Sequence, residues 1–177
     1  MKARKILLPT LSLTLICLFT AFTLALTNYL TKDQIAKAER EAYLSAAREV
    51  LAADTLTELA RKDMEGFVGT DAEGKVVGYV FKTSAKGYGG TLSIVVGLDA
   101  DGSVVGVSVE ATDETPGLGK NVEKSEFLSL FIGKSAAERP VIKENVDAVT
   151  GATYSSRAVA EGVSLAISYY ETLTKGE

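Results

Sequence analysis

The stretch that decides the fold is TLSIVVGLDADGSVVGVSVEA, residues 91–111. Two valine-rich segments, residues 91–98 and 103–111, stand on either side of the spacer DADG. β-Branched residues fit the half-buried surface of a sheet, and short spacers rich in Asp and Gly are typical of hairpin turns. The stretch therefore predicts two antiparallel strands joined by a tight turn.

A second hairpin is predicted immediately before the first. Residues 67–70 and 75–83 flank the spacer DAEG, which is another hairpin-turn signal. Residues 84–90, rich in glycine, are expected to form a flexible loop between the two hairpins. The middle of the chain is thus predicted to be an antiparallel sheet.

Helical patterns follow the strands. Residues 125–132 are expected to form a short helix with Ser125 as its cap, and residues 155–173 a longer one whose apolar positions share one face. Residues 141–149 are interpreted as a strand or an extended segment. The predicted fold class is α+β, a single domain with antiparallel strands and flanking helices.

Composition restricts the function. The 177 residues are 46% hydrophobic and 24% charged, as in globular proteins, and the net charge of −4 argues against a nucleic-acid partner. The chain has no histidine and one cysteine, Cys17, which excludes iron–sulfur, histidine-held haem, Cys/His zinc and nucleophile–histidine sites within one chain. A redox role would need an organic cofactor.

The N-terminus predicts a membrane anchor. Residues 1–5 carry three basic side chains and residues 6–30 carry no charge, which is long enough for a transmembrane helix. Basic residues before the span favour a cytoplasmic N-terminus, with the remaining chain outside the cytoplasm. A cleaved signal peptide and a lipoprotein modified at Cys17 are the weaker alternatives. Residues 31–62 are expected to form a helical spacer, with a helix from residue 31 to about residue 53, and residues 63–177 the folded domain.

Three segments have compositions that suit a cofactor. The first, KGYGG (residues 86–90), offers Tyr88 for stacking, and the second, DETPGLGK (residues 113–120), exposes backbone groups beside Leu118. The third, TGATYSS (residues 150–156), precedes a helix, whose N-terminus suits a phosphate. Each segment taken alone is equally an ordinary loop, turn or helix cap.

The three segments in this order resemble the FMN-binding domain shared by the G subunit of the Rnf complex and the C subunit of the sodium-pumping NADH:quinone oxidoreductase. The resemblance runs over residues 66–170 and rests on GYGG at 87–90, ETPGLG at 114–119 and DAVTGAT at 147–153. The last is similar to the family's flavinylation signature, in which the final residue, here Thr153, takes the FMN. The short chain is more similar to the Rnf protein.

The resemblance implies one covalent FMN on Thr153, attached by a separate Mg²⁺-dependent flavin transferase that uses FAD as donor. It also implies no catalytic residue and no metal site in the chain itself. The residues expected to bind the cofactor are Tyr88, Glu114, Thr115, Leu118, Gly119, Lys120, Thr150, Gly151 and Ala152.

The function implied is an electron-transfer subunit in the cytoplasmic (inner) membrane. The other subunits of an Rnf-type, ion-translocating ferredoxin:NAD⁺ oxidoreductase would be its partners. One alternative is a freestanding flavinylated protein for extracellular electron transfer. An alternative of a different class is a membrane-tethered binding module without redox chemistry.

Overall fold

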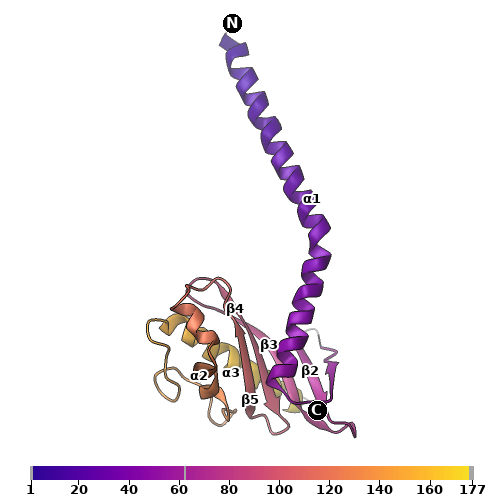
Figure 1. The fold of residues 1–177 in the computed structure, drawn as a ribbon, viewed down its shortest axis with the longest axis vertical. Helices are drawn as coiled ribbons and strands as arrows, with labels where there is room; N and C mark the ends of the chain where they lie inside the picture. The colour runs from indigo at the N-terminus through magenta and orange to yellow at the C-terminus, as the bar shows by residue number, and fades with distance from the viewer. Residues whose placement is uncertain (1, 62, 176–177) are drawn as a thin grey trace. The chain divides into compact units, whose positions relative to one another are not determined.

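The computed structural model describes residues 2–61 and 63–175, and the chain forms two compact units, one ending at Ala42 and the other beginning at Tyr43. The second unit contains the sheet and the helices that follow it (Figure 1). The helices and strands are α1 (Lys2–Val50), β1 (Thr55–Glu58), β2 (Glu65–Thr70), β3 (Val76–Lys86), β4 (Thr91–Asp99), β5 (Val104–Glu110), η1 (Gly119–Glu123), α2 (Ser125–Leu128), η2 (Ser129–Phe131) and α3 (Thr153–Lys175).

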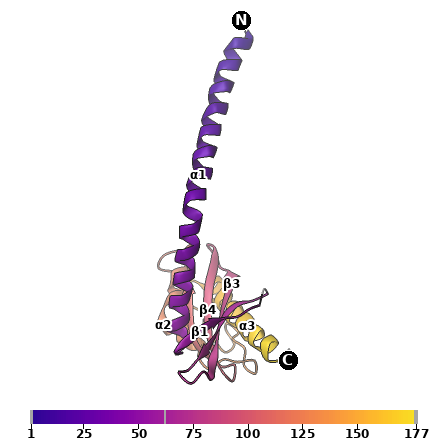
Figure 2. The same ribbon diagram turned by 90° about the vertical axis from the view of Figure 1, so that its right-hand side faces the viewer.

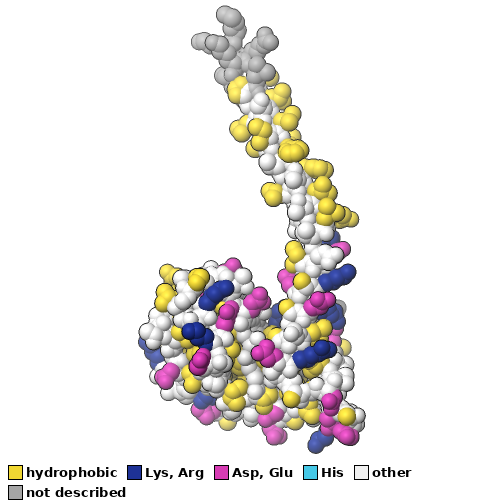
Figure 3. Space-filling model, in the orientation of Figure 1, with side chains coloured by type: hydrophobic (Ala, Val, Ile, Leu, Met, Phe, Trp, Pro, Cys, Tyr) yellow, Lys and Arg dark blue, Asp and Glu magenta, His cyan; other side chains and the backbone are white. Residues whose placement is uncertain are grey.

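The first unit is the larger part of α1. Its segment from Pro9 onward is long and apolar enough to cross a membrane, and hydrophobic side chains cover it in Figure 3. Its hydroxyls donate to backbone carbonyls one turn earlier, as Thr23 does to Phe19 over 2.8 Å and Thr27 to Thr23 over 2.9 Å. These bonds satisfy the threonine hydroxyls within the helix, as a hydrocarbon environment requires.

The sheet has the strand order β1-β2-β3-β4-β5, and every neighbouring pair is antiparallel. Both predicted hairpins are confirmed. In each turn an Asp carboxylate accepts a hydrogen bond from the backbone N–H four residues further on. The Asp71 carboxylate accepts from the backbone N–H of Lys75 over 2.8 Å, and that of Asp99 accepts from Ser103 over 2.9 Å. Local side-chain bonds of this kind fix a turn without help from the rest of the fold.

α3 and the last turns of α1 cover opposite faces of the sheet (Figures 1 and 2). In β4 the alternate residues Ile94 and Val96 are fully buried in the cluster that includes α3, whereas Val95 packs in the cluster with α1. Alternation with a period of two places successive side chains on opposite faces. Each such buried aliphatic side chain stabilises the fold by about 1.5–3 kcal/mol.

Two paired glycines let the end of α1 approach the sheet closely. Gly97 of β4 and Gly106 of β5 are register partners, and a Cβ on either would lie 2.3 Å from the carbonyl oxygen of Val50. Tyr43, Ala47 and Val50 are buried against this face. The final turns of α1 therefore belong to the core of the sheet-containing unit.

Some predicted elements are wrong in extent or type. The helix expected from residue 31 to about residue 53 ends at Val50, and within the rest of the predicted helical spacer Thr55–Glu58 form the edge strand β1. The predicted loop 84–90 is shorter, because β3 continues through Lys86 in register with β4. The predicted C-terminal helix begins two residues earlier than expected, at Thr153.

Two further expectations are wrong for local reasons. Residues 141–149 form no named strand and contribute only an isolated bridge between Ile142 and Val146, because Lys143 adopts φ +73° and interrupts an extended path. Ser125 does not cap α2. Lys124 occupies the cap position, and its side chain makes no capping bond.

Candidate functional site

Thr153 is the first residue of α3 and lies half-buried after a tight turn. Gly151 has φ +76°, and the backbone N–H of buried Ala152 donates to the Val149 carbonyl over 3.0 Å. Ser156 closes the turn from inside the helix: its Oγ donates to the Ala152 carbonyl over 2.9 Å and accepts from the Val149 N–H over 3.0 Å. The Thr153 hydroxyl makes no hydrogen bond within the described residues, so it is not used as a cap.

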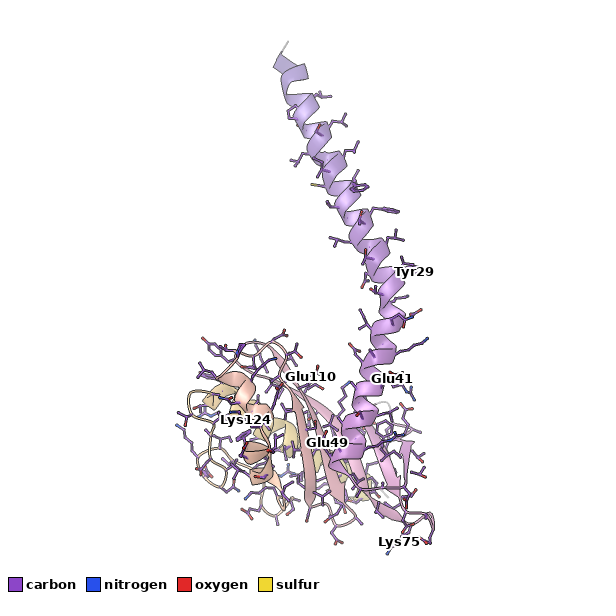
Figure 4. The ribbon with its side chains drawn as sticks, viewed as in Figure 1. Tyr29, Glu41, Glu49, Lys75, Glu110 and Lys124 are labelled. Carbon is purple, nitrogen blue, oxygen red and sulfur yellow. The ribbon has the colours of Figure 1, made fainter. Side chains whose placement is uncertain are left out.

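The loop after β5 is held in a compact turn. The Thr115 carbonyl accepts from the backbone N–H groups of Leu118 and Lys120, each over 3.2 Å, and Gly117 adopts φ +78°. The turn follows Glu110, the last residue of β5, which is labelled in Figure 4. Thr115 and Leu118 are exposed, Lys120 is half-buried and Gly119 is buried.

The glycine loop between β3 and β4 packs directly against the loop after β5. Its own turn is closed by a 2.8 Å bond from the Gly87 N–H to the Gly90 carbonyl. A Cβ on Gly89 would lie 2.2 Å from the Asp113 carbonyl oxygen, and one on Gly90 would lie 2.6 Å from the Asp113 Cβ. A side chain at Gly89 or Gly90 would therefore clash with the loop after β5.

The start of α3 contacts both loops. The rings of Tyr88 and Tyr154 have centroids 6.4 Å apart, which joins the first segment to the third. Leu118 joins the second to the third, because its Cδ2 lies 3.0 Å from where a Cβ on Gly151 would stand. The structure thus brings together three segments that are far apart in the sequence.

Glu114 lies beneath these contacts. Its side chain is 3% exposed, and its two carboxylate oxygens accept from the Gly89 N–H over 3.1 Å and from the Ser155 hydroxyl over 2.9 Å. The sequence suggested Glu114 as a cofactor-binding residue. The structure instead shows a side chain turned into the protein between the three segments.

The predicted site residues therefore fall into an exposed and a buried group. Tyr88 and Leu118 are exposed by 77% and 49%, and Tyr154, which follows the half-buried Thr153, is exposed by 68%. Thr150 and Gly151 are also exposed, whereas Ala152 is buried beside them. The exposed group forms an apolar rim, which we define as Tyr88, Leu118 and Tyr154.

Sequence reasoning missed Tyr154, Ser155 and Arg157. Arg157 follows Thr153 by four positions, which places both on one side of α3. Its guanidinium is exposed and has no hydrogen-bond or ion-pair partner in residues 2–61 and 63–175. The four-residue spacing from Thr153 is the sequence signal that could have identified Arg157 as a neighbour of Thr153.

The segment before Thr153 is fixed to α3 by Arg139. Its guanidinium donates to the Ser164 carbonyl over 2.8 Å and to the Ser168 hydroxyl over 2.9 Å, and it pairs with Glu171.

Among the described residues, no group of three or more Asp, Glu, Cys or His side chains is arranged to hold a metal ion.

Comparison with known proteins supports the resemblance. Residues 87–168 match the family of FMN-binding domains, and residues 1–50 match the RnfG N-terminal region. The chain is 31% identical to the G subunit of the proton-translocating ferredoxin:NAD(+) oxidoreductase complex of Clostridium ljungdahlii, over 95% of this chain and 93% of that protein. It is 32% identical to the G subunit of the Na(+)-translocating ferredoxin:NAD(+) oxidoreductase complex of Acetobacterium woodii, over 88% of this chain and 86% of that protein.

A solved structure has the same fold. The C subunit of the Na(+)-translocating NADH-quinone reductase from Parabacteroides distasonis aligns with a TM-score of 0.50 and 25% identity, over 61% of each chain. The α+β fold class is thereby confirmed. On the extent of its similarity to the two ferredoxin:NAD(+) oxidoreductase proteins, the chain belongs to the family of G subunits of ion-translocating oxidoreductase complexes and contains an FMN-binding domain.

Proposed function

We propose that this chain is a membrane-anchored electron-transfer subunit that carries one FMN as a phosphodiester of Thr153. The observation that carries the proposal is the convergence of three separate segments on a half-buried threonine with an unused hydroxyl, at the start of a 23-residue helix. A structural turn alone would not require exposed aromatic side chains around it.

The start of α3 suits the phosphate. The first N–H groups of a helix have no acceptor within the helix, and the helix dipole favours an anion there. Gly151 and Ala152 leave little side-chain bulk beside Thr153, and the unpaired Arg157 supplies a cation one turn further along. Thr150 lies exposed on the approach to the same point.

The apolar rim suits the isoalloxazine ring. An exposed Leu118 and two exposed tyrosines are costly to leave in water, and a planar aromatic ligand would cover them. In this proposal the loop that contains Thr115, Gly119 and Lys120 would hold the polar edge of the ring, and Glu114 would hold that loop in place from inside the protein. FMN supplies one- and two-electron chemistry when bound, while the chain binds it, orients it and limits its contact with water.

The attachment step requires a second protein. A Mg²⁺-dependent flavin transferase with FAD as donor would form the bond between the Thr153 oxygen and the FMN phosphorus. The diphosphate bond of FAD breaks in the same step, AMP leaves, and the hydroxyl proton is released. No oxidation or reduction occurs, and the tether then makes the cofactor's effective concentration intramolecular.

Membership of the family supports a place in a membrane complex. Two similar proteins belong to complexes named as ferredoxin:NAD(+) oxidoreductases, so we propose that this chain also works among the other subunits of an Rnf-type complex. The apolar part of α1 would be the anchor. Lys2, Arg4 and Lys5 favour a cytoplasmic N-terminus, with the FMN domain on the outer side of the cytoplasmic membrane.

The test is coexpression of the full-length chain with a flavin transferase, followed by a denaturing gel viewed under ultraviolet light. Wild type and Thr150→Ala should fluoresce, whereas Thr153→Ala should be dark. Thr153→Ser, which keeps a hydroxyl, should still be labelled. A dark wild-type band beside a labelled control substrate would reject the proposal and favour a binding module without redox chemistry.

The same preparation distinguishes membership of a complex from a freestanding flavoprotein. Affinity purification of the labelled chain from its native membrane, in mild detergent, should recover the other subunits in fixed ratio. Recovery of the labelled chain alone would favour the freestanding alternative.

A further inference from the structure

Glu114 is the one charged side chain that is fully buried among the described residues. It makes no ion pair within them, so the carboxylate depends on hydrogen bonds alone. A carboxyl group in the interior is costly unless such bonds satisfy it. A residue of this kind in a loop needs a specific reason for its position.

The two oxygens of Glu114 reach different segments of the chain. Oε1 accepts from the backbone N–H of Gly89, in the loop after β3, over 3.1 Å. Oε2 accepts from the hydroxyl of Ser155, in the first turn of α3, over 2.9 Å. Since Glu114 itself belongs to the loop after β5, one side chain joins all three segments around Thr153.

Backbone encloses this side chain closely. A Cβ on Gly87 would lie 2.2 Å from Oε1, and a Cβ on Gly119 would lie 2.0 Å from Oε2. Both glycines belong to the segments that converge on the site. The space is therefore shaped around a side chain with the full length of glutamate.

We infer that Glu114 is the positioning residue that holds the Gly87–Gly90 loop, the 113–120 loop and the start of α3 in the arrangement that presents Thr153. The inference rests on the proposed attachment of FMN at Thr153. Glu114 acts through the residues that it holds and does not itself touch the cofactor.

The physical reason is that the other hydrogen bonds of these loops close each loop on itself, whereas those of Glu114 are the ones that join one segment to another within the described residues. Tyr88, Leu118 and Tyr154 are exposed, so apolar burial does not fix their positions. Hydrogen bonds to a buried carboxylate are strong and directional, and both of its acceptor atoms are used. Removing the carboxylate would leave the Gly89 N–H and the Ser155 hydroxyl without their acceptor and would let the three segments separate.

Three substitutions in the full-length chain separate hydrogen bonding from charge. Glu114→Ala removes both bonds, and Glu114→Asp shortens the reach by one carbon. Glu114→Gln keeps the length: its carbonyl can accept from Gly89, and its amide can donate to the Ser155 oxygen. Ser155→Ala removes one bond, and it serves as the second test if Glu114→Ala folds poorly. Exposed Glu126→Ala is the matched control.

The first measurement is the initial rate of flavinylation by the transferase, read from in-gel fluorescence. Misplacement by about 1 Å can cost about 100-fold in rate, so we expect a loss of about 10- to 100-fold for Glu114→Ala and Glu114→Asp. Ser155→Ala should lose about 3- to 10-fold, and Glu114→Gln should stay within about 3-fold of wild type.

The second measurement is amide hydrogen exchange of the unlabelled chain, which does not depend on the cofactor. Protection at Gly89 should fall about 10-fold in Glu114→Ala and stay close to wild type in Glu114→Gln, while protection in β4 stays unchanged. Slow flavinylation with unchanged protection at Gly89 would overturn the inference. So would labelling of Glu114→Ala at the wild-type rate, or a Glu114→Gln variant as slow as Glu114→Ala.

The two proposals fail in different ways. A wild-type chain that stays dark beside a labelled control substrate rejects FMN attachment, whatever the hydrogen-exchange protection at Gly89. A labelled wild type with no effect of Glu114→Ala on rate or exchange rejects only the role of Glu114.

Discussion

The Ser155 hydroxyl donates a 2.9 Å hydrogen bond to Oε2 of Glu114, a residue 41 positions earlier in the chain. The bond ties the first turn of α3 to the loop that follows β5. The bond explains how Thr153, half-buried at the helix start and with no side-chain hydrogen bond in the described residues, has a defined position among glycine-rich loops.

Arg157→Met should slow flavinylation about 2- to 5-fold, because an exposed cation near a phosphate at a helix terminus contributes about 0.3–1 kcal/mol. The effect should shrink as salt is raised, since screening weakens exposed charge pairs. Initial labelling rates at low and high ionic strength measure it, with exposed Lys124→Met as the control. An equal loss in the control would assign the effect to net charge.

Arg139→Met should loosen the segment that leads to Thr153. The guanidinium bonds the Ser164 carbonyl, the Ser168 hydroxyl and Glu171, so its loss should cost about 1 kcal/mol at this partly exposed position. Urea unfolding measures the cost, and limited proteolysis should show new cleavage within residues 134–149. Arg61→Met, which breaks an exposed pair with Asp63, should change neither result.

Gly97→Ala should destabilise the domain by about 1–3 kcal/mol, because its Cβ would lie 2.3 Å from the Val50 carbonyl oxygen and push the end of α1 off the sheet. Ser108→Ala on neighbouring β5 adds no atoms and is the control. Thermal unfolding of both variants measures the difference. A Gly97→Ala protein as stable as the control would show that α1 does not depend on this close approach.

Burial raises the pKa of the Tyr43 phenol far above its usual range, and the nearby Glu65 and Glu58 carboxylates raise it further. Because the folded pKa lies above the unfolded one, the stability from Tyr43 is complete below the unfolded pKa, about 10, and is lost as the pH rises above it. Unfolding midpoints from about pH 8 to about pH 11 should fall less steeply for Tyr43→Phe than for wild type. Exposed Tyr29→Phe should leave the slope unchanged.

The elements that could be predicted from the sequence are those fixed by local chemistry. Asp71 and Asp99 bond backbone N–H groups two and four residues on, so both hairpins follow from the spacers alone. β1 could not be predicted in this way, because the short segment Thr55–Glu58 is a strand only through its pairing with β2.

At residues 141–149 the sequence predicts a strand or an extended segment where the structure has a turn. Their apolar pattern favours a strand, but the Asn145 side chain accepts from the Val141 N–H over 2.7 Å and turns the chain back on itself. Ile142 and Val146 then enter the core from a turn and not from a strand. The local hydrogen bond between Val141 and Asn145 therefore replaces the extended conformation that the apolar pattern favours.

Part of the candidate site could be predicted from the sequence, and part could not. The sequence indicated three segments that suit a cofactor, and the structure brings them into contact through Tyr88 with Tyr154 and Leu118 with Gly151. The burial of Glu114 could not be predicted, because its partners come from a loop 25 residues before it and a helix 41 residues after it. Contacts of that range follow only from the assembled sheet.

The most direct test of the central proposal is peptide mass spectrometry of the full-length chain after coexpression with a flavin transferase. The proposal predicts one FMN per chain, with the added mass on the peptide that contains Thr153 and fragment ions that place it on that residue. FMN found on Thr150, or an unmodified Thr153 peptide from a chain exposed to a transferase that labels its control substrate, would contradict it.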